Sequence, residues 1–363
     1  MERVLLIIEG PACEGFEGRI GGICSIKYRL PALGMYVLEI NAANIDSLMG
    51  IEGVGLVCAS THIMAQSRPT GRGITIAILD TGIAPIPDFA RPKNRLLASV
   101  DFVGHKPHPY DDNGHGTHVA GIAAGNGWAS GGRILGAAAE AGLVSVKILD
   151  EGGRGNTADA LAGIQWVIDN RRRYGIRIAN LSIGTDDLGS CDPLVRAVEA
   201  AWDAGIVVCV AAGNNGPAAQ SVTSPGISRK VITVGVSDDF HHTDIWGSRM
   251  VNFSGRGPTS ECIIKPDILA PGHDIVSCLS NSPELGAARR SSMKLVGENY
   301  VKMSGTSMAS PAIAGAVALL LSRRPRLSPD EVKLMIKLSA RDMGQSPNRQ
   351  GWGEIDIEKL LSL

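Results

Sequence analysis

Apolar runs that alternate with helical patterns constrain the fold of this chain more than any other feature of its sequence. The runs are short and nearly continuous, which is typical of parallel strands that are buried on both faces. Such alternation predicts a doubly wound, mostly parallel α/β sheet with helices on both faces, whose functional residues gather at the carboxyl ends of the strands. The expected strands are 74–79, 142–149, 177–181, 206–211 and 231–236, and the expected helices are 115–124, 157–174, 192–204, a segment beginning near Ser307, and 329–339.

The N-terminal part of the chain has a different texture. Its apolar runs are shorter and lie closer together, as in a small α+β unit, and they end before a stretch rich in proline and glycine that reads as a linker. A chain of 363 residues also exceeds the usual size of one domain. We therefore predict a small α+β domain over residues 1–64 and a larger domain over 65–363. The expected small-domain strands are 4–8, 25–30, 35–40 and 54–58, with a helix over 44–49 capped by Asn44 and a linker over 66–73.

Charge and cysteine usage exclude several classes of function. The 35 basic and 36 acidic residues give a net charge of −1, so there is no basic excess of the kind that binds nucleic acid. The seven cysteines are odd in number and form no Cys-x-x-Cys pair, which argues against a disulfide framework or a zinc site. No apolar stretch is long enough to span a membrane, and the run 4–8 is too short for a signal peptide. We expect a cytoplasmic protein that binds neither nucleic acid nor membranes.

A helix start built around a serine occupies residues 303–311, Met-Ser-Gly-Thr-Ser-Met-Ala-Ser-Pro. The small and apolar residues that follow are long enough for about three helical turns. Thr306 or Ser307 is placed to cap the helix, and Pro311 is tolerated in a first turn. Taken alone, Ser307 is most simply a helix cap.

Three further polar side chains are expected at loop ends of the same sheet. Asp80 ends the first core strand, His115 begins a helix after a glycine-rich turn, and Asn214 follows the strand 206–211. Each alone has an ordinary reading as a turn or helix-start residue. Together with Ser307, they are the carboxylate, imidazole, amide and hydroxyl that acyl transfer requires.

A metal site is the alternative reading of the histidines. His115 and His118 are three residues apart and could face the same way, but the Glu of a His-Glu-x-x-His motif is absent and no third ligand follows at a usual spacing. We therefore expect no catalytic metal and predict that His118 is a buried, hydrogen-bonded structural residue.

The motifs around these residues closely resemble those of the subtilisin (subtilase) family of serine proteases, in particular its intracellular bacterial type. Asp80 lies in Ile-Leu-Asp-Thr-Gly-Ile, His115 in Asn-Gly-His-Gly-Thr-His-Val-Ala-Gly and Ser307 in Gly-Thr-Ser-Met-Ala-Ser-Pro, in the family's order Asp, His, Ser. The resemblance implies that Ser307 is the nucleophile, His115 the general base and then acid, and Asp80 the partner that fixes the imidazole tautomer. Asn214 and the Ser307 backbone N–H would form the oxyanion hole. An α/β-hydrolase does not fit, because Ala309 stands where its elbow needs glycine.

The resemblance also implies how an extended polypeptide substrate binds. The substrate would lie as a third strand between the segments Ser182-Ile183-Gly184 and Gly153-Arg154-Gly155, held by backbone hydrogen bonds. Arg154 suggests a preference for acidic side chains nearby. A roomy, apolar primary specificity pocket would be lined by Ala211, Ala212 and Gly213.

The N-terminal unit resembles a shortened propeptide of the family. Residues 60–64 would then lie in the cleft, and the unit would act as intramolecular inhibitor and chaperone until autocleavage near Met64 and Ala65. The chain would thus be a zymogen. The competing hypothesis is a catalytically silent binding or regulatory scaffold of the same fold.

No cofactor is required for catalysis in this family, although many members bind structural calcium. Asp88 and Asn126 lie near the places where the family binds it, but the loop 125–132 differs from the family pattern. Structural calcium is therefore an open alternative here.

Overall fold

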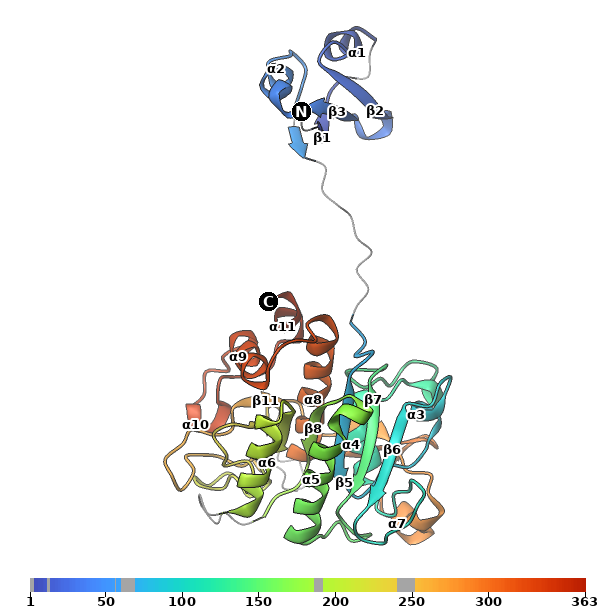
Figure 1. Cartoon of the computed structure of the whole chain (residues 1–363), viewed down its shortest axis with the longest axis vertical. Helices are drawn as coiled ribbons and strands as arrows, with labels where there is room; N and C mark the ends of the chain where they lie inside the picture. Colours follow the sequence, from blue (N-terminus) through green and yellow to red (C-terminus); the bar gives the residue numbers. More distant parts are fainter. Residues whose placement is uncertain (1–2, 12–13, 56, 60–68, 186–191, 240–251) are drawn as a thin grey trace, which may run out of the picture. The chain divides into compact units, whose positions relative to one another are not determined.

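The computed structural model describes residues 3–11, 14–55, 57–59, 69–185, 192–239 and 252–363 (Figure 1). The chain divides into two compact units, Met1–Arg68 and Pro69–Leu363, and each has its own buried apolar core. The boundary predicted between residues 64 and 65 lies outside the described residues. Among those that are described, no helix is both long and apolar enough to cross a membrane.

The N-terminal unit is an antiparallel sheet with two short helices. Its core is formed by buried side chains of both the sheet and the helices, including Leu6, Ile8 and Leu38 of the strands and Phe16 of the first helix. The helix that contains Phe16 was not predicted, because its glycines weaken the helical pattern. Strand order is β2-β3-β1-β4, with β1 Arg3–Glu9, β2 Cys24–Leu30, β3 Met35–Asn41 and β4 Val57–Ala59, and the helices are α1 Glu14–Ile20 and α2 Ile45–Met49.

Asn44 precedes α2 but does not cap it with its side chain, so this prediction was wrong. A 3-10 turn over Ala42–Asn44 leads into the helix, and the side chain of Asn41 caps that turn by accepting a bond from the Ala43 N–H. The cap therefore lies one turn earlier than the sequence pattern indicated.

The larger unit is built on a parallel sheet, as predicted, although the sheet has seven strands where five were expected. All five expected strands are present, within two residues of their predicted bounds. The two edge strands were missed, since β6 is only partly buried and β11 has three residues. Strand order is β11-β10-β9-β8-β5-β7-β6, with β5 Thr75–Asp80, β6 Leu96–Asp101, β7 Gly142–Lys147, β8 Ile176–Leu181, β9 Val207–Ala211, β10 Ile232–Val236 and β11 Ile268–Ala270.

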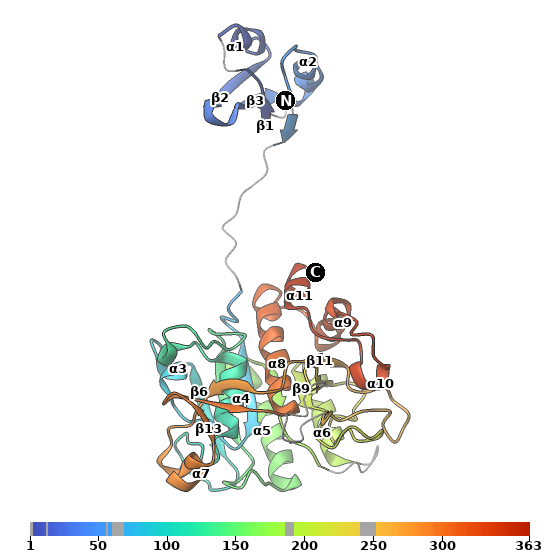
Figure 2. The same cartoon turned by 180° about the vertical axis from the view of Figure 1, so that it is seen from behind.

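Helices cover both faces of this sheet, which confirms the doubly wound architecture. Figures 1 and 2 show α5 and α6 on one face, and α4 and α8 on the other. The principal helices are α4 His115–Ala124, α5 Thr157–Tyr174, α6 Pro193–Asp203, α8 Thr306–Arg323 and α9 Pro329–Ser339. The shorter helices are α3 Pro87–Ala90, α7 Ala287–Ser291, α10 Pro347–Gln350 and α11 Ile357–Ser362. A separate, small antiparallel sheet has the strand order β12-β14-β13, with β12 Ile275–Cys278, β14 Tyr300–Met303 and β13 Lys294–Val296.

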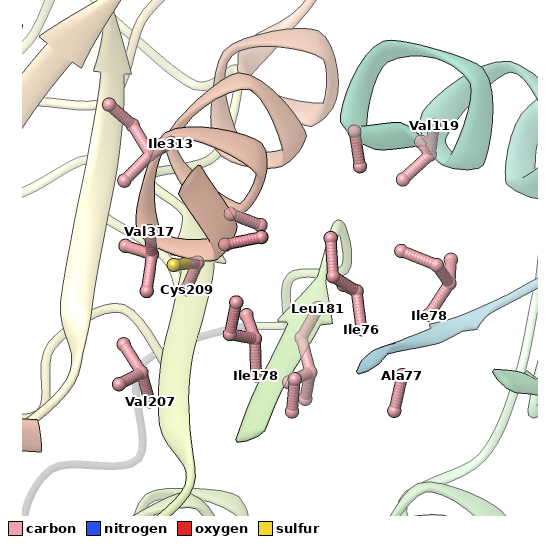
Figure 3. Close-up of a cluster of buried hydrophobic side chains, with 14 of the residues drawn as sticks. Ile76, Ala77, Ile78, Val119, Ile178, Leu181, Val207, Cys209, Ile313 and Val317 are labelled. Carbon is pink, nitrogen blue, oxygen red and sulfur yellow. The ribbon is translucent and has the colours of Figure 1, made fainter. Parts of the chain in front are cut away.

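Helix α8 runs through the core of this unit. Figure 3 shows Ile313 and Val317 of α8 above strand β9, while Ile76 and Ile78 of β5 point toward Val119 on α4. A Cβ atom on Gly315 would lie 2.6 Å from Ala137 Cβ, so only glycine permits this close packing of α8. The start of α8 is therefore fixed rigidly beside the carboxyl ends of the central strands.

Candidate active site

A short hydrogen bond joins the predicted carboxylate and imidazole. Asp80 is the last residue of β5 and is fully buried, and its Oδ1 lies 2.7 Å from Nδ1 of His115, the first residue of α4. Since a carboxylate only accepts hydrogen bonds, Nδ1 carries the proton and Nε2 of the neutral ring keeps its lone pair. The backbone N–H of Thr81 also donates to Asp80 Oδ1, at 2.7 Å, which fixes the carboxylate in place.

Opposing effects set the basicity of His115. Burial lowers its pKa, whereas the charge of Asp80 and the hydrogen bond to it raise the pKa. The carboxylate prevails, so the pKa of His115 lies above its ordinary value of 6.5. An imidazolium formed during reaction is therefore stabilised, as a general base requires.

A buried carboxylate, Asp111, shapes the turn that delivers His115. It accepts bonds from the Gly114 N–H at 2.8 Å, from the Thr117 hydroxyl at 2.6 Å and from the Thr81 hydroxyl at 2.8 Å. The turn is thereby tied to the end of β5. Sequence reasoning missed this role, and its signal was the glycine-rich turn Asp-Asp-Asn-Gly, whose first residue is placed to accept several N–H bonds.

Glycine next to His115 permits the close approach of α4 to β5. A Cβ atom on Gly116 would lie 2.1 Å from the carbonyl oxygen of Gly82 and 3.2 Å from Asp80 Cβ. Any side chain at this position would push His115 away from Asp80.

A buried lysine braces the same region. Lys147, the last residue of β7, donates from Nζ to the Thr81 carbonyl at 2.9 Å, to Asp112 Oδ1 at 2.7 Å and to the Leu149 carbonyl at 2.7 Å. It connects the strand end that carries Asp80 with the turn before His115. The role of Lys147 was not predicted, because its partners lie far apart in the sequence.

Ser307 is the second residue of α8, and it does not act as the helix cap that its motif alone indicates. The N-cap is Gly305, no side chain of the helix caps it, and Pro311 lies in the second turn rather than the first. The Ser307 hydroxyl instead donates to the Ser182 carbonyl at 3.3 Å. The backbone N–H of Ser307 lies at the positive end of the helix dipole, where it is available to a ligand.

The amide of Asn214 is oriented by the same helix start. Its Oδ1 accepts bonds from the Thr306 N–H at 2.9 Å and the Thr306 hydroxyl at 3.0 Å. Because the oxygen is occupied in this way, the NH₂ group of Asn214 is left to donate. This amide and the Ser307 N–H are therefore two donors at one helix start, which suits a developing oxyanion.

A series of buried hydrogen bonds links helix α8 to the end of β8. The Ser310 hydroxyl donates to Asn180 Oδ1 at 2.8 Å, and Asn180 Nδ2 donates to the Ser182 hydroxyl at 3.0 Å. The Ser182 hydroxyl then donates to the Ser307 carbonyl at 3.1 Å. Asn180 and Ser310 were not predicted, and they position Ser307 relative to the segment that begins at Ser182.

One cleft of about 860 Å³ contains the candidate residues. His115, Asn214 and Ser307 line it, and the buried Asp80 lies behind His115. The predicted substrate segments also line the cleft, as do residues that were not predicted. The former are Ser182, Ile183, Gly184, Gly153, Arg154, Gly155, Ala211 and Gly213, and the latter include Asn113, Asn156, Leu194, Thr223 and Arg289.

Ala212 is an exception among the predicted pocket residues. It does not line the cleft and is fully buried. Its N–H donates to the Val234 carbonyl at 2.9 Å and its carbonyl accepts from the Thr223 N–H at 3.0 Å. Successive residues of an extended segment face opposite sides, so Ala211 faces the cleft while Ala212 faces away.

His118 is a buried structural residue, as predicted. Its Nε2 lies 3.1 Å from the carbonyl oxygens of Ile275 and Val301, so it carries the proton and donates to both. Burial, and to a lesser extent the neighbouring His115, lower the pKa of His118 from 6.5 to about 4. The ring is therefore neutral and does not take part in the chemistry.

Asp88 and Asn126, near which structural calcium was left open, bind other groups of the chain. Asp88 accepts bonds from the Ala129 N–H at 2.8 Å and from the Tyr300 hydroxyl at 2.9 Å, so both of its oxygens are engaged. The side chain of Asn126 donates to the Arg91 carbonyl. Within the described part of the chain, no cluster of three or more His, Cys, Asp or Glu residues could hold a metal ion. These contacts account for the side chains of Asp88 and Asn126 without a bound ion, and structural calcium stays an open alternative.

Comparisons with known proteins agree with this geometry. The sequence pattern of the Subtilase family matches residues 71–353. Serine protease AprX of Bacillus subtilis is 46% identical over 300 residues, which are 80% of this chain and 67% of that protein. Thermostable alkaline protease of Halalkalibacterium halodurans is 35% identical over 283 residues, 78% of this chain and 66% of that protein. The chain thus spans about two thirds of the length of these two relatives.

Solved structures show the same likeness. A cold adapted subtilisin-like serine proteinase superposes with a TM-score of 0.60 and 28% identity, covering 80% of this chain and 89% of that one. A psychrophilic protease superposes with a TM-score of 0.63 and 28% identity, covering 79% of this chain and 92% of that one.

Proposed function

The chain belongs to the subtilase family of serine endopeptidases, and we propose that it cleaves peptide bonds through an acyl-enzyme on Ser307. The main support for this assignment of residues is the 2.7 Å hydrogen bond between Asp80 and His115. His115 in turn lines the same cleft as Ser307 and Asn214. A catalytically silent scaffold gains no support, because all four positions hold the residue types that catalysis requires, with His115, Asn214 and Ser307 lining one cleft and Asp80 bonded to His115.

Acylation begins when the Ser307 hydroxyl turns from the Ser182 carbonyl toward Nε2 of His115. Nε2 takes the hydroxyl proton while Oγ bonds to the carbonyl carbon of the substrate, and Asp80 stabilises the imidazolium. The Asn214 amide and the Ser307 N–H donate to the oxyanion. The C–N bond then breaks, His115 gives its proton to the leaving amine, and the acyl group remains on Ser307.

Deacylation repeats these steps with water. His115 takes a proton from a water molecule whose oxygen bonds to the acyl carbon, and it then returns that proton to Ser307 Oγ as the ester bond breaks. The products are a carboxylic acid and the regenerated hydroxyl.

The substrate is an extended polypeptide that lies between the segments 153–155 and 182–184. Both segments line the cleft, and backbone pairing with them tolerates many substrate sequences. The residue whose carbonyl is attacked directs its side chain toward Ala211 and Gly213. There, Gly184 and Gly213 lie so close to the Thr223 hydroxyl that Cβ atoms on them would approach it to 2.4 and 2.5 Å. These glycines keep the pocket open.

Digestion of an unfolded protein tests the activity. The wild-type chain should cleave reduced and alkylated casein at many internal bonds, and mass spectrometry of the product termini then gives the preferred residues. Ser307→Ala should leave casein intact, because it lacks the attacking oxygen. Equal digestion by Ser307→Ala would refute the assignment.

We also propose that the N-terminal unit is a propeptide that inhibits and chaperones its own catalytic unit. Support comes from its compactness as a separate unit with its own core. Autocleavage is proposed between Met64 and Ala65. The intact mass of the wild type after activation should lack residues 1–64, while Ser307→Ala should keep its full mass. A fully active wild type that retains Met1 would contradict autocleavage.

A cytoplasmic location is a further proposal. Four cysteines in the described part of the chain, Cys24, Cys209, Cys262 and Cys278, are free thiols, as is usual in a reducing compartment. Fractionation of the source cells with an antibody against the chain tests it, and recovery outside the cytoplasm would contradict it.

A further inference from the structure

Among the described residues that line the cleft, Arg154 and Arg289 are the charged ones apart from the titratable His115, and both are positive. Arg154 and Arg289 line it beside His115, and no Asp or Glu is among the described residues that do so. Both guanidinium groups belong to exposed residues, and neither forms an ion pair with a carboxylate of the described part of the chain. The described lining of the cleft therefore presents positive charge to a substrate.

Arg289 is held against the turn that precedes His115. It lies in the short helix α7, and its Nη2 and Nε lie 3.3 Å from Oδ1 and 3.4 Å from the carbonyl oxygen of Asn113. Asn113 is buried, lies two residues before His115, and donates from Nδ2 to the Glu151 carbonyl at 2.8 Å. Neutral acceptors thus orient the guanidinium without cancelling its charge.

Nearby carboxylates are mostly engaged elsewhere. Asp112 is paired with Lys147 at 2.7 Å, and Asp150 Oδ1 accepts the backbone N–H groups of Gly152 and Arg154 at 2.9 and 2.8 Å. Glu151 is exposed and does not line the cleft. The charge of Arg289 therefore remains available to a substrate.

The position of Arg289 indicates which substrate residue it meets. Side chains of an extended peptide alternate between two sides. When the residue that is attacked points toward Ala211 and Gly213, the residue before it points to the other side of the peptide. Asn113 forms the wall there, because its Nδ2 would lie 3.5 Å from a Cβ atom on Gly153, and Arg289 covers Asn113.

We propose that Arg289 is a specificity-determining residue that selects Asp or Glu at the position immediately before the residue whose carbonyl is attacked. The inference rests on the proposed endopeptidase function and narrows its substrates to peptides with an acidic residue at that position. The carboxylate of such a residue pairs with the guanidinium, and its pairing geometry favours arginine over lysine.

This pairing has a second, electrostatic consequence. The charge of Arg289 lowers the pKa of His115, as one of the smaller effects after burial and Asp80. A substrate carboxylate bound to Arg289 offsets that charge. The acid limb of the pH profile for kcat/KM reports the free enzyme, so it should be the same for acidic and neutral substrates, whereas the limb for kcat should lie at higher pH with acidic ones.

The test compares peptide pairs that differ only by Glu against Gln at this position. The wild type should cleave the Glu peptide with about three- to tenfold higher kcat/KM at low salt, and the preference should shrink as salt is added. Arg289→Ala should remove the preference, and Arg289→Glu should invert it toward a Lys peptide. Arg290→Ala is the matched control, because Arg290 donates to the Glu298 carbonyl at 2.9 Å and does not line the cleft.

Labelling by a fluorophosphonate distinguishes a failure of the proposed endopeptidase function from a failure of the proposed role of Arg289. Absence of a label on Ser307 would overturn the proposed function and this inference with it. Normal labelling with equal rates for the Glu and Gln peptides would overturn this inference alone. A preference that survives in Arg289→Ala but disappears in Arg154→Ala would also overturn it, since Arg154 would then be the selecting residue.

Discussion

Two substitutions of Asn214 separate its role in catalysis from its role in the fold. Its oxygen accepts from the N–H and hydroxyl of Thr306, and its NH₂ group is the proposed oxyanion donor. Asn214→Ala removes both functions. Asn214→Asp keeps an acceptor for Thr306 and removes the donor, so it isolates the catalytic contribution.

The expected magnitudes follow from these contacts. Loss of one oxyanion donor lowers kcat by about 10² to 10³, or about 2.7–4 kcal/mol in the activation barrier. In Asn214→Asp the loss of kcat should be larger still, because a carboxylate repels the oxyanion. Thr306 is fully buried, so Asn214→Ala should also cost about 1–3 kcal/mol of unfolding free energy through its unpaired donors. Asn214→Asp should not, since a carboxylate at a helix start is favourable.

The assay measures kcat and KM with a chromogenic peptide, and urea unfolding in a Ser307→Ala background that prevents self-digestion. KM should change little, because the donor acts mainly in the transition state. A kcat of Asn214→Ala within tenfold of the wild type would refute the oxyanion assignment. An equal loss of stability in both variants would refute the assigned orientation of the amide.

Three further predictions concern the surrounding groups. His115 acts as a base only when it is neutral, and Asp80 raises its pKa above 6.5 against the opposing effect of burial, so kcat/KM should rise with pH through that raised value. Asp80→Asn should move the acid limb of this pH profile to lower pH and reduce kcat by about 10⁴. An acid limb that does not move in Asp80→Asn would contradict the pairing of Asp80 with His115. The pKa of His118 is lowered to about 4 in the folded chain, so protonation of this residue favours the unfolded chain. Urea titration of Ser307→Ala should therefore show an unfolding free energy that falls by up to about 3 kcal/mol as the pH drops from 6.5 to 4. The same pH dependence after a further His118→Gln substitution would exclude His118 as its cause. Ser310→Ala leaves Asn180 Oδ1 without its donor and should lower kcat/KM for peptides about tenfold, through changes in both kcat and KM. Unchanged steady-state kinetics would show that this hydrogen bond does not position Ser307.

Local sequence signals were sufficient to predict the central sheet and several helix ends. Buried parallel strands read as apolar runs because both faces are covered. Helix α9 begins after Ser328, which forms a capping box with Glu331, and α5 begins after Asn156, whose side chain accepts from the Asp159 N–H. In each case the capping residue and its partner lie within one helical turn of each other, so such a cap can be predicted from the local sequence.

The start of α8 was predicted to within one residue, but its cap was not, for the opposite reason. Its pattern offered Thr306 and Ser307 as caps, but Asn214, 92 residues earlier, accepts the Thr306 N–H instead. A tertiary contact thus replaces the local cap and leaves Ser307 free for chemistry. The interpretation of Ser307 as a helix cap was therefore wrong, and its hydroxyl is not used to cap the helix.

Partners distant in sequence account for what was missed in the site. Asn180 and Ser310 are 130 residues apart, and Arg289 meets Asn113 across 176 residues. Their residue types are ordinary, so nothing in the sequence marks them until the fold brings them together. By contrast, Asp80, His115, Asn214 and Ser307 were predictable as candidates because each stands in a family motif at a strand or helix end.

The most direct test of the proposed mechanism is to label the chain with a fluorophosphonate and to map the adduct by mass spectrometry. This reagent modifies a serine only when a base activates it beside donors that stabilise the resulting anion. We predict one adduct, on Ser307, that is absent from Ser307→Ala and forms far more slowly in His115→Ala. No adduct on Ser307, or an adduct that forms equally fast without His115, would contradict the account.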